Sequence, residues 1–498
     1  MSADKILLFI CFTGVVLVLQ GMLNLSAEHH EISPSKYITC SPKADSQTIP
    51  KPNLKLSAEH HDILPTDSQT KPEANLNLSA EHHEISPTAI QKPLSEKMQD
   101  SASCRCTGGS TGTENTAQTE PKLLKNTFVD SVQSQRRRTM LTECLSLGTN
   151  YTGTLPENLL KKHMIYDDKT KLVFCDIPKV GSTFLKQVLH ILSGHKHKKD
   201  PFSIKANAAH LIPFNTFETV PYDKALAVLM RSTKFIFVRN PYTRMLSGYV
   251  DKLFTNNHVF WDTTGKVILK NHRKNLSKKS KECGHDSTFS EFIKHVIESE
   301  TSGLHRNPHW YPMYDACRPC NIQYDVIGKI ESFKEDLGNF LRSQNLHEIV
   351  DISRMDQGNE KEAISLTVSR AYEVVSHRPK CTSLPQALER AWKVLQIRGV
   401  LSQLADFPYN VIKHNSNISK SQFQDVIAKE IKRWPMTKAD KRLSREQAIV
   451  NAYKFVSSSD LKRFNSIFHP DFSIFGYDKK IGRKHANFLK WEPFKLKL

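Results

Sequence analysis

Two apolar runs, each followed by a turn and a helical pattern, constrain the fold of this chain most strongly. Residues 171–177 are Lys-Leu-Val-Phe-Cys-Asp-Ile; the turn Pro-Lys-Val-Gly-Ser follows, and then helical spacing over 184–192. Residues 234–238 repeat this order, with Arg-Asn-Pro before a helical pattern at about 242–254. A short apolar run between turn residues predicts a buried strand, whereas apolar residues three or four apart predict a helix.

A third unit of the same kind places a predicted strand at 324–328 before a predicted helix at 333–341. Strands that alternate with helices predict an α/β domain whose central, mainly parallel sheet is flanked by helices. We place this domain at residues 141–480 and expect further helices at 384–395, 423–431 and 461–468. Residues 481–498 form a basic C-terminal tail.

The N-terminal region predicts entry into the secretory lumen. Residues 6–23 are uncharged and mostly apolar, which is long enough for a helix across a bilayer. We expect an uncleaved anchor behind a cytoplasmic tail at 1–5. A cleaved signal peptide is the alternative, although its apolar stretch is usually ~7–15 residues. Four candidate N-glycosylation sites agree with a luminal address: Asn77, Asn150, Asn275 and Asn417.

Residues 24–140 are poor in large apolar side chains, so they cannot bury enough surface to offset chain entropy. Leu-Ser-Ala-Glu-His-His occurs three times there at irregular spacing, which does not suit a stacked repeat. We predict a flexible stalk. The paired histidines could hold a metal, but solvated side chains are the commoner case: His29, His30, His60, His61, His82 and His83.

Charge and cysteine content agree with this compartment. The net charge of +19 favours an acidic partner, and the luminal address favours a polyanionic glycan over nucleic acid. The ten cysteines suit an oxidising lumen. Cys11 lies in the apolar segment and Cys175 in a buried strand, so we expect disulfides among the others. Cys317-x-x-Cys320 has no second pair at zinc-ribbon spacing, which favours disulfides over zinc.

The first strand-to-helix turn has the composition of an anion site. A helix N-terminus that follows a tight turn presents backbone N–H groups and a positive dipole end. Glycine permits close backbone approach, and the hydroxyl groups and the lysine add donors. No Gly-x-x-x-x-Gly-Lys-[Ser/Thr] loop is present, which argues against an NTPase. The candidate residues are Pro178, Lys179, Val180, Gly181, Ser182, Thr183 and Phe184.

The second turn places an arginine at the carboxyl end of a strand, where open α/β sheets bind ligands. Arg239 offers a planar donor fork for a phosphate, and Ser247 follows about two helical turns later. Taken alone, either turn could be an ordinary strand-to-helix connection. The candidates in this second element are Arg239, Asn240, Pro241, Arg244 and Ser247.

Together, about 60 residues apart, the two turns resemble the two PAPS-binding elements of sulfotransferases. The block at 309–331 and the ending at 464–477 resemble those of the HNK-1/chondroitin 4-O-sulfotransferase family. Two departures leave the acceptor glycan open. Gly-Ser-Thr-Phe at 181–184 stands where the family usually has Ala-Cys-Thr-Asn, and Asn240 stands where it usually has His, Asp or Glu.

The resemblance implies a P-loop-like sulfotransferase fold in a single-pass type II Golgi membrane protein with PAPS as donor and no metal. It implies that Lys179 contacts the oxygen that bridges phosphate and sulfate. Gly181, Ser182 and Thr183 would hold the 5′-phosphosulfate. Arg239 and Ser247 would hold the 3′-phosphate.

A base is needed for the sugar hydroxyl, and the sequence leaves His210, His309 or neither. The favoured acceptor is chondroitin or dermatan, sulfated at O-4 of GalNAc. The alternatives are a uronyl 2-O-sulfotransferase and a catalytically inactive luminal glycan-binding protein.

Overall fold

The computed structural model describes residues 120–148, 163–414, 417–481 and 491–497, all within one compact unit, Gly109–Leu498. The expected cytoplasmic tail, the anchor, most of the stalk, and Asn77 and Asn150 lie outside the described residues. Within the described part of the chain, no helix is both long and apolar enough to span a membrane. Asn275 and Asn417 are exposed, as N-glycan acceptors must be.

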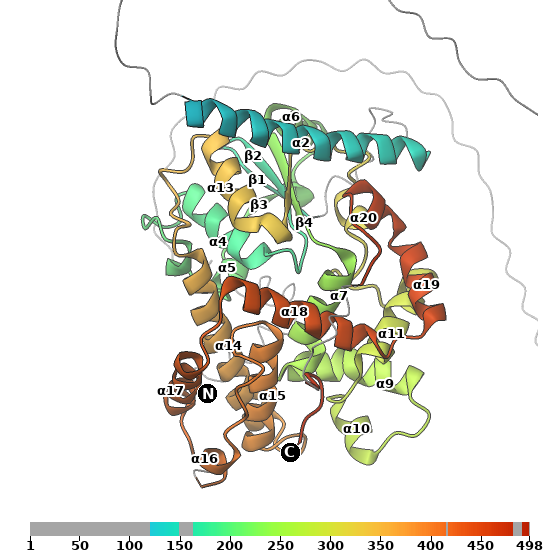
Figure 1. Cartoon of the computed structure of the whole chain (residues 1–498). Helices are drawn as coiled ribbons and strands as arrows, with labels where there is room; N and C mark the ends of the chain where they lie inside the picture. The colour runs from blue at the N-terminus through green and yellow to red at the C-terminus, as the bar shows by residue number, and fades with distance from the viewer. Residues whose placement is uncertain (1–119, 149–162, 415–416, 482–490, 498) are drawn as a thin grey trace, which may run out of the picture. The chain divides into compact units, whose positions relative to one another are not determined.

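The domain contains a five-stranded sheet in the order β3-β1-β2-β4-β5, which lies in the upper part of the view in Figure 1. The central pairs β2–β4 and β4–β5 are parallel, whereas β1 runs antiparallel to both β2 and β3. The predicted parallel arrangement is therefore confirmed for the three strands that precede the two turns and the third helix, but the sheet as a whole is mixed. The strands are β1 (Met164–Asp167), β2 (Leu172–Cys175), β3 (Asn215–Thr216), β4 (Thr233–Val238) and β5 (Val326–Lys329).

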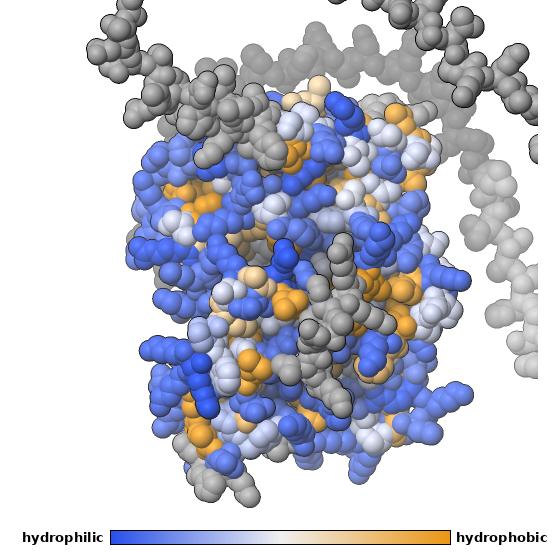
Figure 2. Space-filling model, in the orientation of Figure 1, coloured by the Kyte–Doolittle hydropathy of each residue, from blue (hydrophilic) through white to orange (hydrophobic). Residues whose placement is uncertain are grey.

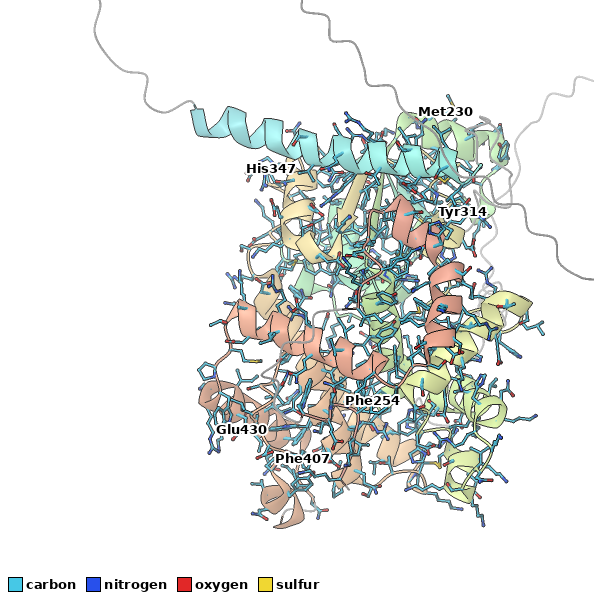
Figure 3. The ribbon with its side chains drawn as sticks, turned by 45° about the vertical axis from the view of Figure 1, so that its right-hand side comes forward. Met230, Phe254, Tyr314, His347, Phe407 and Glu430 are labelled. Atoms are coloured by element: carbon cyan, nitrogen blue, oxygen red, sulfur yellow. A yellow bond between two sulfur atoms is a disulfide. The ribbon has the colours of Figure 1, made fainter. Side chains whose placement is uncertain are left out.

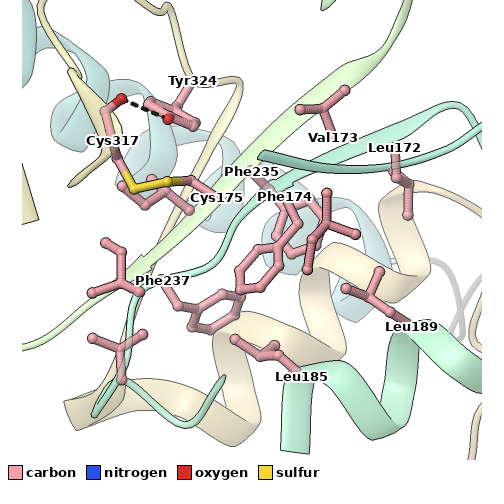
Figure 4. Packing of buried hydrophobic residues seen from close by; sticks show 14 of the residues in the cluster. Leu172, Val173, Phe174, Cys175, Leu185, Leu189, Phe235, Phe237, Cys317 and Tyr324 are labelled. Carbon is pink, nitrogen blue, oxygen red and sulfur yellow. Dashed lines mark hydrogen bonds between the residues drawn. A yellow bond between two sulfur atoms is a disulfide. The ribbon is translucent and has the colours of Figure 1, made fainter. Parts of the chain in front are cut away.

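Aromatic and aliphatic side chains bury both faces of the parallel strands. Phe174 and Phe235 pair in register on β2 and β4 and stack with ring centroids 4.9 Å apart. Phe340 packs on Phe235 from one face, and Leu185 and Leu189 approach from a helix (Figure 4). Strands that are covered on both faces are apolar at successive positions. For this reason the apolar runs at 171–177 and 234–238 could be recognised as strands in the sequence.

Helices predicted from periodicity are present with small shifts at their ends: α4 (Ser182–Leu192), α13 (Phe333–Ser343), α15 (Leu384–Ile397), α17 (Lys420–Arg433) and α19 (Ser458–Ile467). The helix predicted at 242–254 begins as α7 (Pro241–Tyr249) and continues with π-helical winding over η4 (Val250–Phe254). The remaining helices are α2 (Glu120–Ser146), α5 (Ala208–Leu211), α6 (Tyr222–Arg231), α8 (His258–Phe260), η5 (Trp261–Gly265), α9 (Lys266–His272), α10 (Lys278–Cys283), α11 (Phe289–Ser302), α12 (Met313–Cys317), α14 (Met355–His377), α16 (Tyr409–His414), α18 (Lys438–Tyr453) and α20 (His469–Ile474), with short 3₁₀ turns η2 (Pro201–Ser203), η3 (Phe217–Thr219) and η6 (Ile330–Ser332).

Both ends of the folded domain extend beyond the expected boundaries. Helix α2 starts inside the segment expected to be stalk and contacts β5 and α20. It crosses the top of the view in Figure 1. Gln133 and Arg136 on this helix donate to the carbonyl oxygen of Ile327, and Met140 is buried. At the other end, Trp491 is buried although it belongs to the expected tail.

The helices away from the sheet have hydrophobic cores of their own. Phe254 belongs to a cluster that includes residues of α7, α11 and α18, and Phe407 to one built on α14, α15 and α17 (Figure 3). The face seen in Figure 2 is largely hydrophilic with scattered apolar patches.

Three disulfides cross-link the domain: Cys144–Cys320, Cys175–Cys317 and Cys283–Cys381. The preference for disulfides over zinc at Cys317 and Cys320 is confirmed. The exclusion of Cys175 from pairing was wrong. Its strand is buried as expected, but Cys317 approaches it from α12, and burial in a strand does not prevent a neighbouring element from supplying a second thiol.

Candidate functional site

A cavity of about 410 Å³ opens where β2 and β4 end. Its lining brings together most of the residues selected from the two turns: Lys179, Gly181, Ser182, Thr183, Phe184, Arg239 and Ser247. The other lining residues come from α7, η4 and η6 and from helices farther along the chain: Thr243, Leu246, Val250, Ile330, Asn359, Glu362, Ile397, Arg398, Arg445 and Ile449.

The first turn depends on glycine at position 181. Gly181 has a φ of +82° and directly precedes the first residue of α4. A Cβ atom there would lie 2.9 Å from Cε2 of Phe333, so a side chain would be both strained and crowded. Lys179 also has a positive φ, of +73°. This tight backbone directs the first turn of α4, whose N–H groups have no intrahelical acceptors, toward the cavity.

The two turns are in direct contact. Nη1 of Arg239 donates to the carbonyl oxygen of Lys179 at 3.2 Å, and Nε donates to Oγ1 of Thr243 at 2.9 Å. These neutral partners hold the guanidinium in place without cancelling its charge. Burial lowers the pKa of Arg239 from its ordinary value. A single ligand with two anionic ends can therefore reach both turns.

Lys179 is paired with a carboxylate that several cations share. Its Nζ lies 2.7 Å from Oδ2 of Asp251 on η4. The same carboxylate lies within 3.0 Å of Arg370 and 3.3 Å of Arg398 and Lys252. Burial opposes the ionisation of Asp251, but these cations hold its pKa well below the ordinary value. Four cations around one carboxylate leave a local excess of three positive charges (4 − 1), which suits a polyanionic ligand.

The ammonium of Lys179 is itself shifted. Burial lowers its pKa to about 8, while Asp251 acts in the opposite direction and keeps the group protonated near neutral pH. Lys179 is therefore a cation held next to the cavity by a partner that a stronger anion can replace.

Arg244 lies outside the cavity lining, although it was selected with the second turn. Its side chain is fully buried. The guanidinium donates to the carbonyl oxygens of Pro178, Pro308 and Tyr311 at 3.1, 3.2 and 2.6 Å. Arg244 thus fastens the first turn to the segment after α11 by three backbone contacts.

Four other selected residues also build the turns without lining the cavity. Val180 is buried in the main core, and Pro178 accepts the bond from Arg244. Asn240 caps α7 by accepting the N–H of Tyr242, and Pro241 occupies the first position of that helix.

His210 stands beside the first turn. Its Nε2 lies 3.0 Å from Oγ1 of Thr183, and its Nδ1 lies 3.4 Å from Nζ of Lys186. The side chain is exposed, yet loss of hydration around the ring and the nearby ammonium of Lys186 lower its pKa. His210, Lys186 and Asp176 also line a second cavity, of about 480 Å³, whereas Thr183 lines the first.

His309 is more enclosed. Its Nδ1 lies 2.8 Å from Oδ1 of Asn307, and its ring packs edge-on against Phe260. Burial, reinforced by the charges of Lys252 and Lys179, lowers its pKa to about 3. An imidazole with so low a pKa is a weak proton acceptor.

Sequence reasoning missed the helical wall of the cavity. Asn359 and Glu362 lie on α14, Arg398 caps the C-terminal end of α15, and Arg445 lies on α18. Each is a single polar residue within a helical pattern, and such a residue gives no local sign that it faces a ligand.

The sequence profile of the sulfotransferase family matches residues 162–394, a span that contains both turns and His210 and His309. Residues 162–394 are therefore similar to the sulfotransferase family. The chain spans about half the length of the curated relatives it matches. No solved structure matches this chain with significance.

Carbohydrate sulfotransferases are among its relatives. Carbohydrate sulfotransferase 11 of Rattus norvegicus is 36% identical over 188 residues, which cover 36% of this chain and 52% of the relative. Carbohydrate sulfotransferase 14 of Danio rerio is 31% identical over 214 residues (42% and 57%). Carbohydrate sulfotransferase 8 of Mus musculus is 27% identical over 241 residues (47% and 56%). These relatives confirm the resemblance that the motifs predicted.

Proposed function

We propose that this chain is a carbohydrate O-sulfotransferase that transfers the sulfonyl group of PAPS to a sugar hydroxyl. The observation that carries the proposal is the contact between the two turns, in which Arg239 donates to the carbonyl of Lys179 at the wall of one cavity. PAPS has an anionic group at each end of its adenosine, and the joined turns offer cationic and hydroxyl donors to both.

The residues at the cavity fit this donor. Ser182, Thr183 and the N-terminus of α4 suit the 5′-phosphosulfate, because hydroxyl and backbone N–H groups converge there. Arg239 and Ser247 suit the 3′-phosphate. Arg445 adds a second guanidinium to the same lining and acts electrostatically on Arg239.

The transfer itself requires charge stabilisation more than covalent chemistry. The acceptor oxygen forms a bond to sulfur while the bond from sulfur to the bridging phosphate oxygen breaks, so negative charge develops on that oxygen. The ammonium of Lys179 leaves Asp251 for this developing charge, and the fixed donors of α4 hold the group in line. The leaving group is adenosine 3′,5′-bisphosphate.

We assign the base to His210 rather than His309. His210 lines the second cavity and contacts Thr183 of the donor cavity, so it is near enough to meet a sugar hydroxyl that approaches the sulfur. Its neutral ring can take the hydroxyl proton. His309 has a pKa of about 3, which makes it the poorer acceptor of that proton.

The finer assignments rest on the motifs. The resemblance to the HNK-1/chondroitin 4-O-sulfotransferase family supports GalNAc O-4 of chondroitin or dermatan as the acceptor, with uronyl 2-O transfer as the rival. The three disulfides support an oxidising compartment, and with the apolar segment at 6–23 they support a Golgi membrane location.

The test is incubation of the full-length protein with [³⁵S]PAPS and a panel of chondroitin, dermatan, heparan and N-glycan acceptors, with the Arg239→Ala variant as control. We expect label in one acceptor class and its loss in the variant; disaccharide analysis then locates the sulfated carbon. Glycan binding without PAPS binding or transfer would instead support the inactive glycan-binding alternative.

A further inference from the structure

Three side chains with metal-ligating atoms gather far from the donor cavity. His258 comes from α8, and Glu373 and His377 come from the last turns of α14. One ligand atom of each lies within 4.8 Å of the others. Glu373 and His377 are four residues apart, so they share one face of the helix. Their partner His258 is more than a hundred residues away in the sequence.

The two histidine rings lie face to face, and one of them has a defined tautomer. The rings of His258 and His377 are nearly parallel, with centroids 4.8 Å apart and an interplanar angle of 8°. Nδ1 of His377 lies 2.8 Å from the backbone carbonyl oxygen of Glu373 and donates to it. That bond fixes the tautomer in which Nε2 carries the free lone pair, which is how proteins commonly prepare a histidine for a metal.

The framework around the three residues is already fixed. Arg378, directly after His377, donates to Asp262 at 3.1 Å. The disulfide Cys283–Cys381 fastens the segment that follows α14. Asp262 pairs with both Arg378 and Lys266 and so reduces the positive charge beside the cluster. A cavity of about 330 Å³ reaches His377 and gives an ion a path from solvent.

We propose that His258, Glu373 and His377 bind one Zn²⁺ ion, with water in the fourth position. Two imidazoles and a carboxylate are ligands of borderline to hard character, which suits zinc and disfavours Ca²⁺ or Mg²⁺. The ion cross-links α8 to α14. It takes no part in sulfonyl transfer, because Glu362 of the donor cavity lies eleven residues before Glu373, about 16 Å along the helix. The proposal does not rest on the proposed function.

Zinc binding is measured by isothermal titration calorimetry of the full-length protein. The six paired stalk histidines are replaced by alanine in every sample, because they would add binding events of their own. We expect one Zn²⁺ per chain at this site and no binding of Ca²⁺ or Mg²⁺. The His258→Ala and His377→Ala variants should each lose that event, with affinity falling more than about 100-fold, and Glu373→Gln should weaken it by about 10–100-fold.

His347→Ala is the matched control, since His347 is a partly exposed histidine beside a glutamate, Glu348, outside the cluster. It should leave the zinc event unchanged. Equal zinc stoichiometry and affinity in the starting protein and in the His258→Ala/His377→Ala double variant would overturn the proposal. So would a loss of binding in His347→Ala equal to that in the cluster variants.

A spectroscopic measurement covers the case in which a variant does not fold. Zinc K-edge X-ray absorption of the metal-loaded protein should show two imidazole nitrogens at about 2.0 Å and one carboxylate oxygen. A shell without imidazole, or with sulfur, would exclude this ligand set.

Discussion

The two turns at the proposed donor cavity hold their cations in opposite ways. Arg239 is bound by uncharged groups, the carbonyl of Lys179 and the hydroxyl of Thr243, so its full charge faces the cavity in a fixed position. Lys179 is bound by the carboxylate of Asp251, which three further cations also contact. The first arrangement suits a permanent grip on one end of the donor. The second suits a charge that is transferred to a new anion during the reaction.

The largest effect should come from removing the transferable charge. Lys179→Ala should lower kcat by roughly 10²–10³-fold at saturating PAPS, because a donor to the developing charge is lost. Lys252→Ala is the matched control, since Lys252 contacts the same carboxylate but does not line the cavity. Turnover is measured by steady-state kinetics. A near-native kcat in the Lys179 variant would show that the first turn does not supply a transferable charge.

His210→Ala should reduce kcat by about 10²-fold, toward the lower end for a positioned general base. The wild-type rate should fall at acid pH, as the neutral His210 becomes protonated below its lowered pKa. The variant should lose this acidic limb, whereas His309→Ala should keep it. A pH–rate profile decides, and retention of the limb in both variants would leave neither histidine as the base.

At the fixed end, Arg239→Ala should act on binding. We expect the KM for PAPS to rise by about 10–100-fold, the loss of one or two hydrogen bonds from a charged donor, with a smaller change in kcat. Equilibrium binding of adenosine 3′,5′-bisphosphate should weaken to the same extent. A large fall in kcat with an unchanged KM for PAPS would contradict the role of this turn in binding the donor.

Asp251→Asn sharpens the comparison through pH. Burial lowers the pKa of Lys179 to about 8, and the carboxylate of Asp251 limits that decrease. Without it, the pKa of Lys179 falls further, and the ammonium is lost at lower pH. The alkaline limb of kcat should therefore move to lower pH in the variant, with activity recovered on acidification. An unmoved alkaline limb would show that Asp251 does not govern Lys179.

The smallest effect belongs to Ser247. It lines the cavity on α7 as an uncharged donor, and Ser247→Ala should raise the KM for PAPS by only about 3–10-fold. An increase in KM as large as that of Arg239→Ala would mean that Ser247 contributes as much as the guanidinium to binding the 3′-phosphate.

The sequence predicted the parts of the site that lie within one short segment of the chain. Each turn lies between a buried strand and an amphipathic helix, so chain order alone places Lys179, Gly181 and Arg239 at the ends of parallel strands. Arg244 shows the limit of this reasoning. It lies three residues before Ser247 on the same helix, yet it is buried against backbone carbonyls, and periodicity cannot distinguish a polar residue that faces a ligand from one that fastens a core.

Contacts between segments that are distant along the chain could not be predicted from the sequence. Arg398 and Arg445 reach the cavity only because the ends of α15 and α18 pack beside it. The antiparallel side of the sheet was missed because its strands give little pattern. Strand β3 has only two residues, and β1 (Met-Ile-Tyr-Asp) is buried at its first two positions only, unlike the fully buried β2. Cys175 found its partner through the packing of α12 on β2, which no spacing along the chain encodes.

Helix α2 leads from the N-terminal part of the chain onto the sheet, and the bond between Cys144 and Cys320 lies near its last turn. A pulling force applied at Glu120 would first peel this helix from β5, where only side-chain hydrogen bonds, the ion pair from Arg136 to Asp336 and packing resist. The detachment of α2 would then stop at the Cys144–Cys320 disulfide. Mechanical load from the N-terminal side therefore reaches the sheet through this disulfide. The strands that carry the two turns keep their register while the helix outside them detaches.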